Sequence, residues 1–381
     1  MRRWQATLFL LTTLTALSNV RAEPPLTLDA ALAAASTQHP GMQISQALLD
    51  SSLADQQAAA STTDATLSYE GVLRHGRTST GNEDWQADNS HRLVFRKNLY
   101  DFGRSQNAVE ATRQEVNARR LNFMSEQDVR RIDIMARFFD VLLADAQYAA
   151  DNELTAVHYV RFDDMKKRFD LGELNARDLA QLEAQYHDQR EKRERAQHLQ
   201  RSARQKLAHA INQPGRLPTL LETPRLAQNE QPLPEYEQLL SIALQHNRTL
   251  QALQAQSKAI AARSEALRAN RAPNLDIELS ANDYSRNSIT RDRYNGGLIL
   301  SWPLYQGERV DARLAKERAE RARLEAETEL FKRQLAETVL ELWQEIDWLK
   351  HTARPAAKVQ VQYRDQALER CTDRPYQLHH Q

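Results

Sequence analysis

Histidine, cysteine, serine and carboxylate side chains most often carry out chemistry in proteins, and here they form no recognisable catalytic arrangement. The eleven histidines are scattered along the chain, without a Ser–His–Asp motif, a phosphate-binding loop or a spaced set of metal ligands. Cys371 is the only cysteine, which excludes an internal disulfide framework and a cysteine-based metal site. The many carboxylates lie mostly in helix-forming segments, where they are typical of solvated helix faces. We therefore expect no enzyme, no cofactor and no bound metal.

The charge balance and the first residues restrict the class of protein further. Lysine plus arginine and aspartate plus glutamate each total 51, so charge indicates no nucleic-acid partner. Residues 1–22 are typical of a secretory signal peptide, with a basic start, an apolar stretch of about a dozen residues and a small residue, Ala22, at the cleavage site. That stretch is too short for a membrane-spanning helix, which needs about 20 residues.

Two long helices are predicted. Neither glycine nor proline occurs between Gly103 and Gly172, and residues 105–169 are rich in helix formers, enough for a rod of roughly 90 Å. Their apolar positions follow a heptad pattern that calls for a partner helix: Val129, Ile132, Ala136, Phe139, Leu143, Ala146 and Ala150. A second helical block, residues 309–370, has the same pattern and is expected to be interrupted at Pro355.

Short motifs recur about 205 residues apart and indicate an internal duplication. Residues 98–104 (NLYDFGR) resemble 303–309 (PLYQGER), and residues 38–42 resemble 245–250 in the same order. We expect a first repeat over 23–212, a proline-rich linker over 213–234 and a second repeat over 235–370.

Each repeat contains two candidate strands between a shorter helix and a long one. Leu275, Ile277 and Leu279 alternate with polar residues, and Leu298, Leu300 and Trp302 share one face of the return segment. The first repeat has candidate strands around Leu67–Leu73 and Leu93–Leu99, where Lys97 interrupts the apolar face. Polar loops are expected over 75–90 and 282–293. Strands of about ten alternating residues suit a membrane, although amphipathic hairpins packed on a soluble core show the same alternation.

Taken together, these features resemble the TolC-like outer-membrane efflux family. Further support comes from residues 168–172 (RFDLG), followed by Asp178-Leu179 and Leu182-Glu183-Ala184, which are similar to the family's helical turn at the periplasmic tip. The resemblance implies a mainly α fold with a small β part: a long coiled-coil helical barrel, plus four transmembrane strands per chain that contribute to a trimeric 12-stranded barrel. Four strands alone close no barrel. Ile277 and Leu300 would then face lipid, and Asp276 and Glu278 the lumen.

The resemblance also implies a function, a location and partners. The chain would be an outer-membrane channel subunit of a Gram-negative cell, with a periplasmic helical portion, exporting small molecules or polypeptides in a tripartite efflux pump or a type I secretion system. Its partners would be two further copies, a periplasmic adaptor protein, an inner-membrane pump and outer-membrane lipid. Asp178 is a candidate for the tunnel gate and Arg168 a weaker one. The helix dipole, which favours an aspartate at a helix N-terminus, explains Asp178 equally well. Arg168 is weaker because a basic residue near a helix end needs no gating role.

The end of the sequence departs from the family pattern. Residues 371–381 have no apolar period and no turn glycine, which predicts a truncated or frameshifted tail and an incomplete second repeat without its returning helix. The alternatives are a non-functional truncated channel, a periplasmic adaptor, and a structural coiled-coil protein of the envelope. An adaptor would have a single coiled-coil hairpin, whereas the duplication and the paired strands favour the channel.

Overall fold

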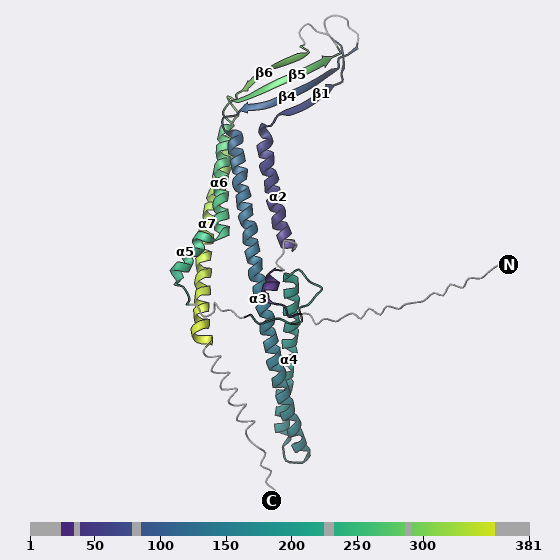
Figure 1. Cartoon of the computed structure of the whole chain (residues 1–381), viewed down its shortest axis with the longest axis vertical. Helices are drawn as coiled ribbons and strands as arrows, with labels where there is room; N and C mark the ends of the chain where they lie inside the picture. Colours follow the sequence, from purple (N-terminus) through teal and green to yellow (C-terminus); the bar gives the residue numbers. More distant parts are fainter. Residues whose placement is uncertain (1–23, 34–38, 78–84, 225–231, 286–291, 355–381) are drawn as a thin grey trace, which may run out of the picture. The chain divides into compact units, whose positions relative to one another are not determined.

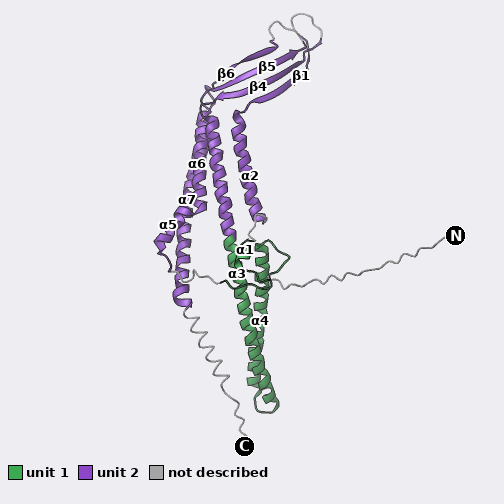
Figure 2. Cartoon of the chain, viewed as in Figure 1, with its two compact units in different colours: residues 1–35, 131–225 green, residues 36–130, 226–381 purple. Residues whose placement is uncertain are grey.

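The structure, a computed structural model, describes residues 24–33, 39–77, 85–224, 232–285 and 292–354 (Figure 1). The expected signal peptide, Pro355 and the tail over 371–381 lie outside the described residues. The chain forms two compact units (Figure 2), one made of residues 1–35 and 131–225 and the other of residues 36–130 and 226–381. These units cut across the expected repeats, whose boundaries remain a prediction.

The two predicted long helices are present. Helix α3 runs over Arg104–Asp170 without interruption, which confirms the prediction for 105–169, and it contributes to both units. Helix α7 covers Arg309–Trp348 and is followed by a π-helical turn, Leu349–Ala353. Gly103 and Gly307 both have positive φ (85° and 62°) just before these helices. Glycine takes this conformation without steric cost, so the recurring motif marks the same strand-to-helix turn twice.

The first unit is a helical hairpin with one small helix beside it. Helix α4 (Ala176–Ala210) returns along α3, and the short helix α1 (Leu28–Ala33) adds to their core. Ile134, Phe138, Val141 and Leu207 are fully buried there. The Arg204 guanidinium binds both carboxylate oxygens of Asp145, at 2.6 and 2.9 Å, and thereby links α4 to α3.

Helix α4 does not cover the face of α3 that contains the heptad residues identified in the sequence. Ile132 and Leu143 are 61% and 70% exposed, whereas Ile134 and Phe138 are fully buried. The partner helix that this pattern calls for is therefore not α4. The reason is that α3 has apolar residues on two faces, and α1 and α4 occupy the other one. We call Ile132, Phe139 and Leu143 the α3 stripe.

The second unit joins four further helical segments to a sheet. Helices α2 (Pro40–Ala60), α5 (Tyr236–His246), α6 (Arg248–Ala269) and α7 accompany the first part of α3. Ala118, Ala252 and Ala255 form a small buried cluster, in which short side chains let α3 and α6 approach closely. Within the described residues, no helix combines the length and the apolarity needed to cross a membrane.

The sheet of this unit is antiparallel, in the order β1 (Thr66–Val72), β4 (Ser90–Tyr100), β5 (Asn274–Tyr284) and β6 (Tyr294–Ser301). Its two central strands come from different halves of the chain, so neither half forms the sheet alone. The segment expected as a loop over 75–90 also contains a minimal hairpin, β2 (His75–Gly76) with β3 (Gln86–Ala87). Four strands of alternating sequence are therefore present where the sequence predicted them.

Candidate functional site

The register of the sheet sorts its side chains by polarity. Lys97, Ile277 and Leu298 lie opposite one another on neighbouring strands, and so do Arg96 and Glu278. Directly paired residues share a face, and successive residues along a strand face opposite sides. The polar sheet face thus contains Glu70, Arg92, Arg96, Asp276, Glu278, Ser280 and Asn282. The apolar sheet face contains Leu67, Leu93, Phe95, Ile277, Leu279, Leu298 and Leu300.

Several side chains of the polar sheet face form hydrogen bonds and ion pairs with one another. The Glu278 carboxylate, 9% exposed, accepts from Arg92 Nη2 at 2.5 Å and from Arg96 Nε at 3.0 Å. Beside it, Ser280 Oγ and Asn295 Oδ1 are 2.6 Å apart. The sequence reasoning missed these ion pairs, although the i, i+4 spacing of the two arginines in a strand already put them on one face. Glu278 is thus a paired, structural residue as well as a member of the polar face.

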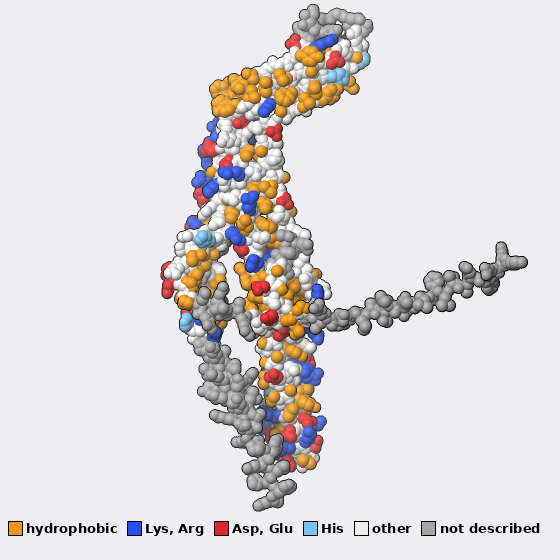
Figure 3. All heavy atoms as spheres, viewed as in Figure 1, with side chains coloured by type: hydrophobic (Ala, Val, Ile, Leu, Met, Phe, Trp, Pro, Cys, Tyr) orange, Lys and Arg blue, Asp and Glu red, His pale blue; other side chains and the backbone are white. Residues whose placement is uncertain are grey.

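The apolar sheet face, by contrast, is open. Leu67, Leu298 and Leu300 are 67%, 66% and 65% exposed. Hydrophobic side chains gather along the sheet and at the end that joins the helices (Figure 3). A soluble sheet buries its apolar side and exposes its polar side, and contiguous exposed apolar patches mark interaction or membrane surfaces. This sheet has the opposite arrangement, so its apolar face is made for a non-aqueous neighbour.

Aromatic rings border the apolar sheet face at both ends. Tyr294, 81% exposed, begins β6, and Trp302, 60% exposed, follows its last residue. The Trp302 indole N–H donates to the Arg271 carbonyl at 3.1 Å, so the ring stays outside while its polar atom is satisfied. Near the same end, Tyr100 and Phe102 contact edge-on, with centroids 4.7 Å apart. Such amphipathic rings at both edges of an apolar band are typical of membrane interfaces.

A bulge changes one prediction for strand β4. The register shifts between Asn98 and Tyr100, so Tyr100, and not Leu99, lies opposite Leu275 on the apolar sheet face. A single extra residue of this kind bends the strand and redirects its side chains. The ring of Tyr100 is thereby added to the aromatic border.

The two gate candidates lie at the tip of the α3–α4 hairpin but not against each other. Gly172 ends α3 with φ +81°, and Asn175 caps α4 by accepting the Asp178 backbone N–H at 2.8 Å. The Asp178 carboxylate in turn accepts from the Asn175 side-chain amide at 2.7 Å. Arg168 Nε donates to Glu173 at 3.2 Å. Each candidate therefore has a local partner, and both are exposed.

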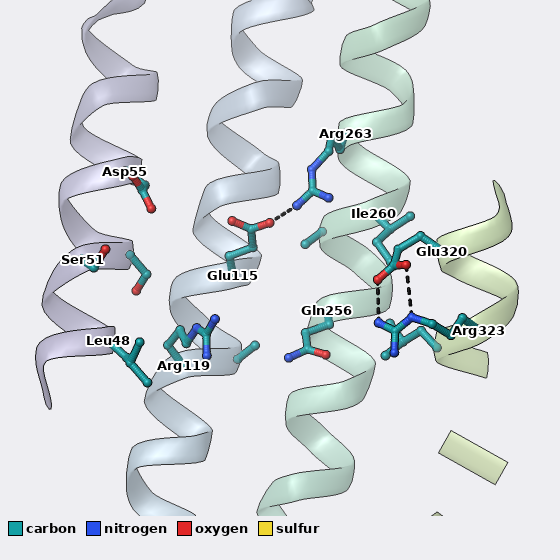
Figure 4. A pocket seen from close by; sticks show the side chains of 14 residues that line it. Leu48, Ser51, Asp55, Glu115, Arg119, Gln256, Ile260, Arg263, Glu320 and Arg323 are labelled. Atoms are coloured by element: carbon teal, nitrogen blue, oxygen red, sulfur yellow. Dashed lines mark hydrogen bonds and ion pairs between the residues drawn. The ribbon is translucent and has the colours of Figure 1, made fainter. Parts of the chain in front are cut away.

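A cavity of about 370 Å³ lies between α2, α3, α6 and α7 (Figure 4). Arg263 on α6 pairs with Glu115 on α3 and, at 3.4 Å, with Glu317 on α7. Arg323 donates two hydrogen bonds to the Glu320 carboxylate, which lowers the pKa of that carboxyl group. Arg263 thus connects α6 to α3, which come from different halves of the chain, and also to α7. Among the described residues, no group of three or more histidine, cysteine, aspartate or glutamate side chains could hold a metal.

Comparison with known proteins gives one consistent result. A family model described as outer membrane efflux protein matches residues 239–373. No curated protein sequence matches the chain.

Solved structures match over most of the chain. Crystal structures of CusC are 18% identical, with 92% of this chain and 83% of that chain covered and a TM-score of 0.72. The outer membrane protein VceC from Vibrio cholerae is 17% identical, with coverages of 91% and 85% and a TM-score of 0.72. The open state of the Neisseria gonorrhoeae MtrE outer membrane channel is 14% identical, with coverages of 89% and 76% and a TM-score of 0.66. At such identities the likeness is one of fold, and it extends over both units.

Proposed function

We propose, from the premise that this chain belongs to the outer membrane efflux protein family, that it is one subunit of a channel across the outer membrane of a Gram-negative cell. The observation that carries the proposal is the sheet. Its apolar face is exposed and bordered by aromatic rings, while its polar face is closed by its own ion pairs. The apolar sheet face suits contact with lipid, and the polar sheet face suits a water-filled lumen.

The free edges of the sheet support an assembly of several copies. Within the described residues, strands β1 and β6 each pair on one side only. An open edge in hydrocarbon leaves backbone groups unsatisfied at several kcal/mol each. We propose that β6 of one copy pairs with β1 of the next, and that three copies give twelve strands in a closed barrel. The exposed α3 stripe would then pack against a neighbouring copy in the helical wall.

The cargo and the partners follow from the same assignment. The channel would export small molecules or polypeptides, as the outer part of a tripartite pump or a type I secretion system. A periplasmic adaptor protein would connect it to an inner-membrane pump. What supports this is the long α3–α4 hairpin, which ends in a tight, exposed and charged turn suited to contact with another protein.

The proposal is tested by expressing the full chain in a Gram-negative host and reconstituting it in a planar lipid bilayer. We expect it in the outer-membrane fraction, cross-linking as a trimer, with discrete conductance steps after reconstitution. Recovery of a soluble, non-conducting monomer that is neither aggregated nor degraded would contradict the channel assignment.

For the tip, we propose that Asp178 contributes negative charge to the tunnel entrance. Asp178→Asn keeps an oxygen for the Asn175 amide but removes the charge, so folding should be unchanged while cation preference of the conductance falls about twofold to fivefold, as for about 0.5–1 kcal/mol of an exposed charge. Asp188→Asn on the same helix, whose carboxylate pairs with Lys192, is the matched control. An equal change in both variants would show that Asp178 acts only as an acidic residue of the first turn of α4 and not at a tunnel entrance.

A further inference from the structure

Lys97 is the residue of the apolar sheet face that the channel assignment does not explain. Among the paired positions of this face it is the only lysine or arginine, and it lies opposite Ile277. Its side chain is exposed and has no hydrogen-bond or ion-pair partner within the described chain. An ammonium group among lipid-facing leucines is unfavourable unless its stem reaches a polar neighbour.

Lys97 lies at the end of the sheet that joins the helices, so a polar partner for its ammonium group must be found there. Thr66, the first residue of β1, pairs with Arg96, so Lys97 lies one position beyond the end of β1. There it lines an open cavity of about 780 Å³, together with Asp64 and Tyr100. The cavity therefore adjoins both the apolar sheet face and the aromatic border.

Two opposite charges in this cavity are left without partners. Asp101, also in its wall, accepts from the Ser105 backbone N–H at 2.8 Å, and Glu110 binds Arg113 at 2.7 Å. These two carboxylates are thus occupied. The side chains of Lys97 and Asp64 have no such contact in the described chain. A ligand that fits would carry a negative and a positive group a short distance apart and an apolar part that continues along the sheet.

We propose that this cavity binds the headgroup of a phosphatidylethanolamine-type phospholipid. Lys97 Nζ donates to the phosphate, the Asp64 carboxylate accepts from the primary ammonium group, and the acyl chains lie along the apolar sheet face next to Tyr100. This site rests on the proposed membrane insertion of the sheet, because only an inserted sheet brings lipid to the cavity.

The experiment first separates the two proposals. Flotation of the full chain with vesicles of phosphatidylcholine alone tests insertion without the proposed ligand. Native mass spectrometry then measures binding of phosphatidylethanolamine, phosphatidylcholine and phosphatidylglycerol with identical acyl chains. The unmodified chain should retain phosphatidylethanolamine about fivefold more tightly than phosphatidylcholine, whose quaternary ammonium donates no N–H hydrogen bond.

Three variants assign the contacts. Lys97→Gln should weaken all three lipids about fivefold, and Lys97→Arg should restore binding. Asp64→Asn should remove only the preference for ethanolamine over choline. Lys166→Gln, at an exposed lysine of α3 far along the chain from Lys97 and Asp64, controls for lost charge and should change nothing. A chain that floats but binds all three lipids equally, or a Lys97→Gln chain that binds like the unmodified one, would overturn the headgroup site. Failure to float at all would contradict the proposed function instead.

Discussion

Leu298→Arg is expected to prevent insertion of the sheet, at a cost of about 2–4 kcal/mol per copy near the middle of the membrane. Leu298 is 66% exposed on the apolar sheet face and lies four residues from both Tyr294 and Trp302. Eight residues of strand span about 26 Å, or about 20 Å of membrane at a tilt of about 40°, close to the apolar band of such proteins. The guanidinium would therefore lie far from both interfaces.

The neighbouring residue is a matched control. Ile299 is on the polar sheet face, opposite Asp276, so Ile299→Arg puts the same side chain beside a carboxylate and water. We expect it to change insertion by less than about 1 kcal/mol. Both free energies can be measured by urea titration of the chain folded into lipid vesicles. Equal costs at 298 and 299 would mean that the sheet does not separate lipid from lumen.

The secondary structure of this protein follows closely from its sequence because its patterns are long. The stretch without glycine or proline between Gly103 and Gly172 leaves one regular option, and α3 takes it. The alternation around Ile277 and Leu298 likewise predicts strands that the sheet contains.

The sequence did not predict which face of a helix is covered or which charged residues form pairs. Helix α3 has apolar residues on more than one face, and only the position of α1 and α4 decides that Phe138 is buried while Leu143 stays open. The pairing of Glu278 with Arg92 and Arg96 requires the register between strands that lie about 180 residues apart. Periodicity carries no information on such a register. The same limit applies to the bulge at Leu99, a single-residue irregularity.

Two adjacent phenylalanines separate folding from assembly. Phe138 is fully buried in the core of the first unit, and Phe139, on the α3 stripe, is 39% exposed. Phe138→Ala should lower the free energy of unfolding of the chain by about 3–5 kcal/mol, because it removes a large side chain from a small core that cannot close the cavity. Since whole domains are stable by only about 5–15 kcal/mol, this loss is a large fraction of the total stability.

Phe139→Ala should behave differently. Its ring packs edge-on against Phe138, with centroids 6.0 Å apart, so a single chain should lose only about 1 kcal/mol. In a trimer, however, the α3 stripe is expected to pack on a neighbouring copy, and truncation there should reduce the cross-linked trimer several-fold while the monomer keeps its helix content. Circular dichroism during urea titration measures the first effect, and cross-linking at fixed chain concentration measures the second. If Phe139→Ala leaves the trimer intact, the α3 stripe is not an interface between copies, and the exposed pattern Ile132–Phe139–Leu143 must contact some other partner of the helical hairpin.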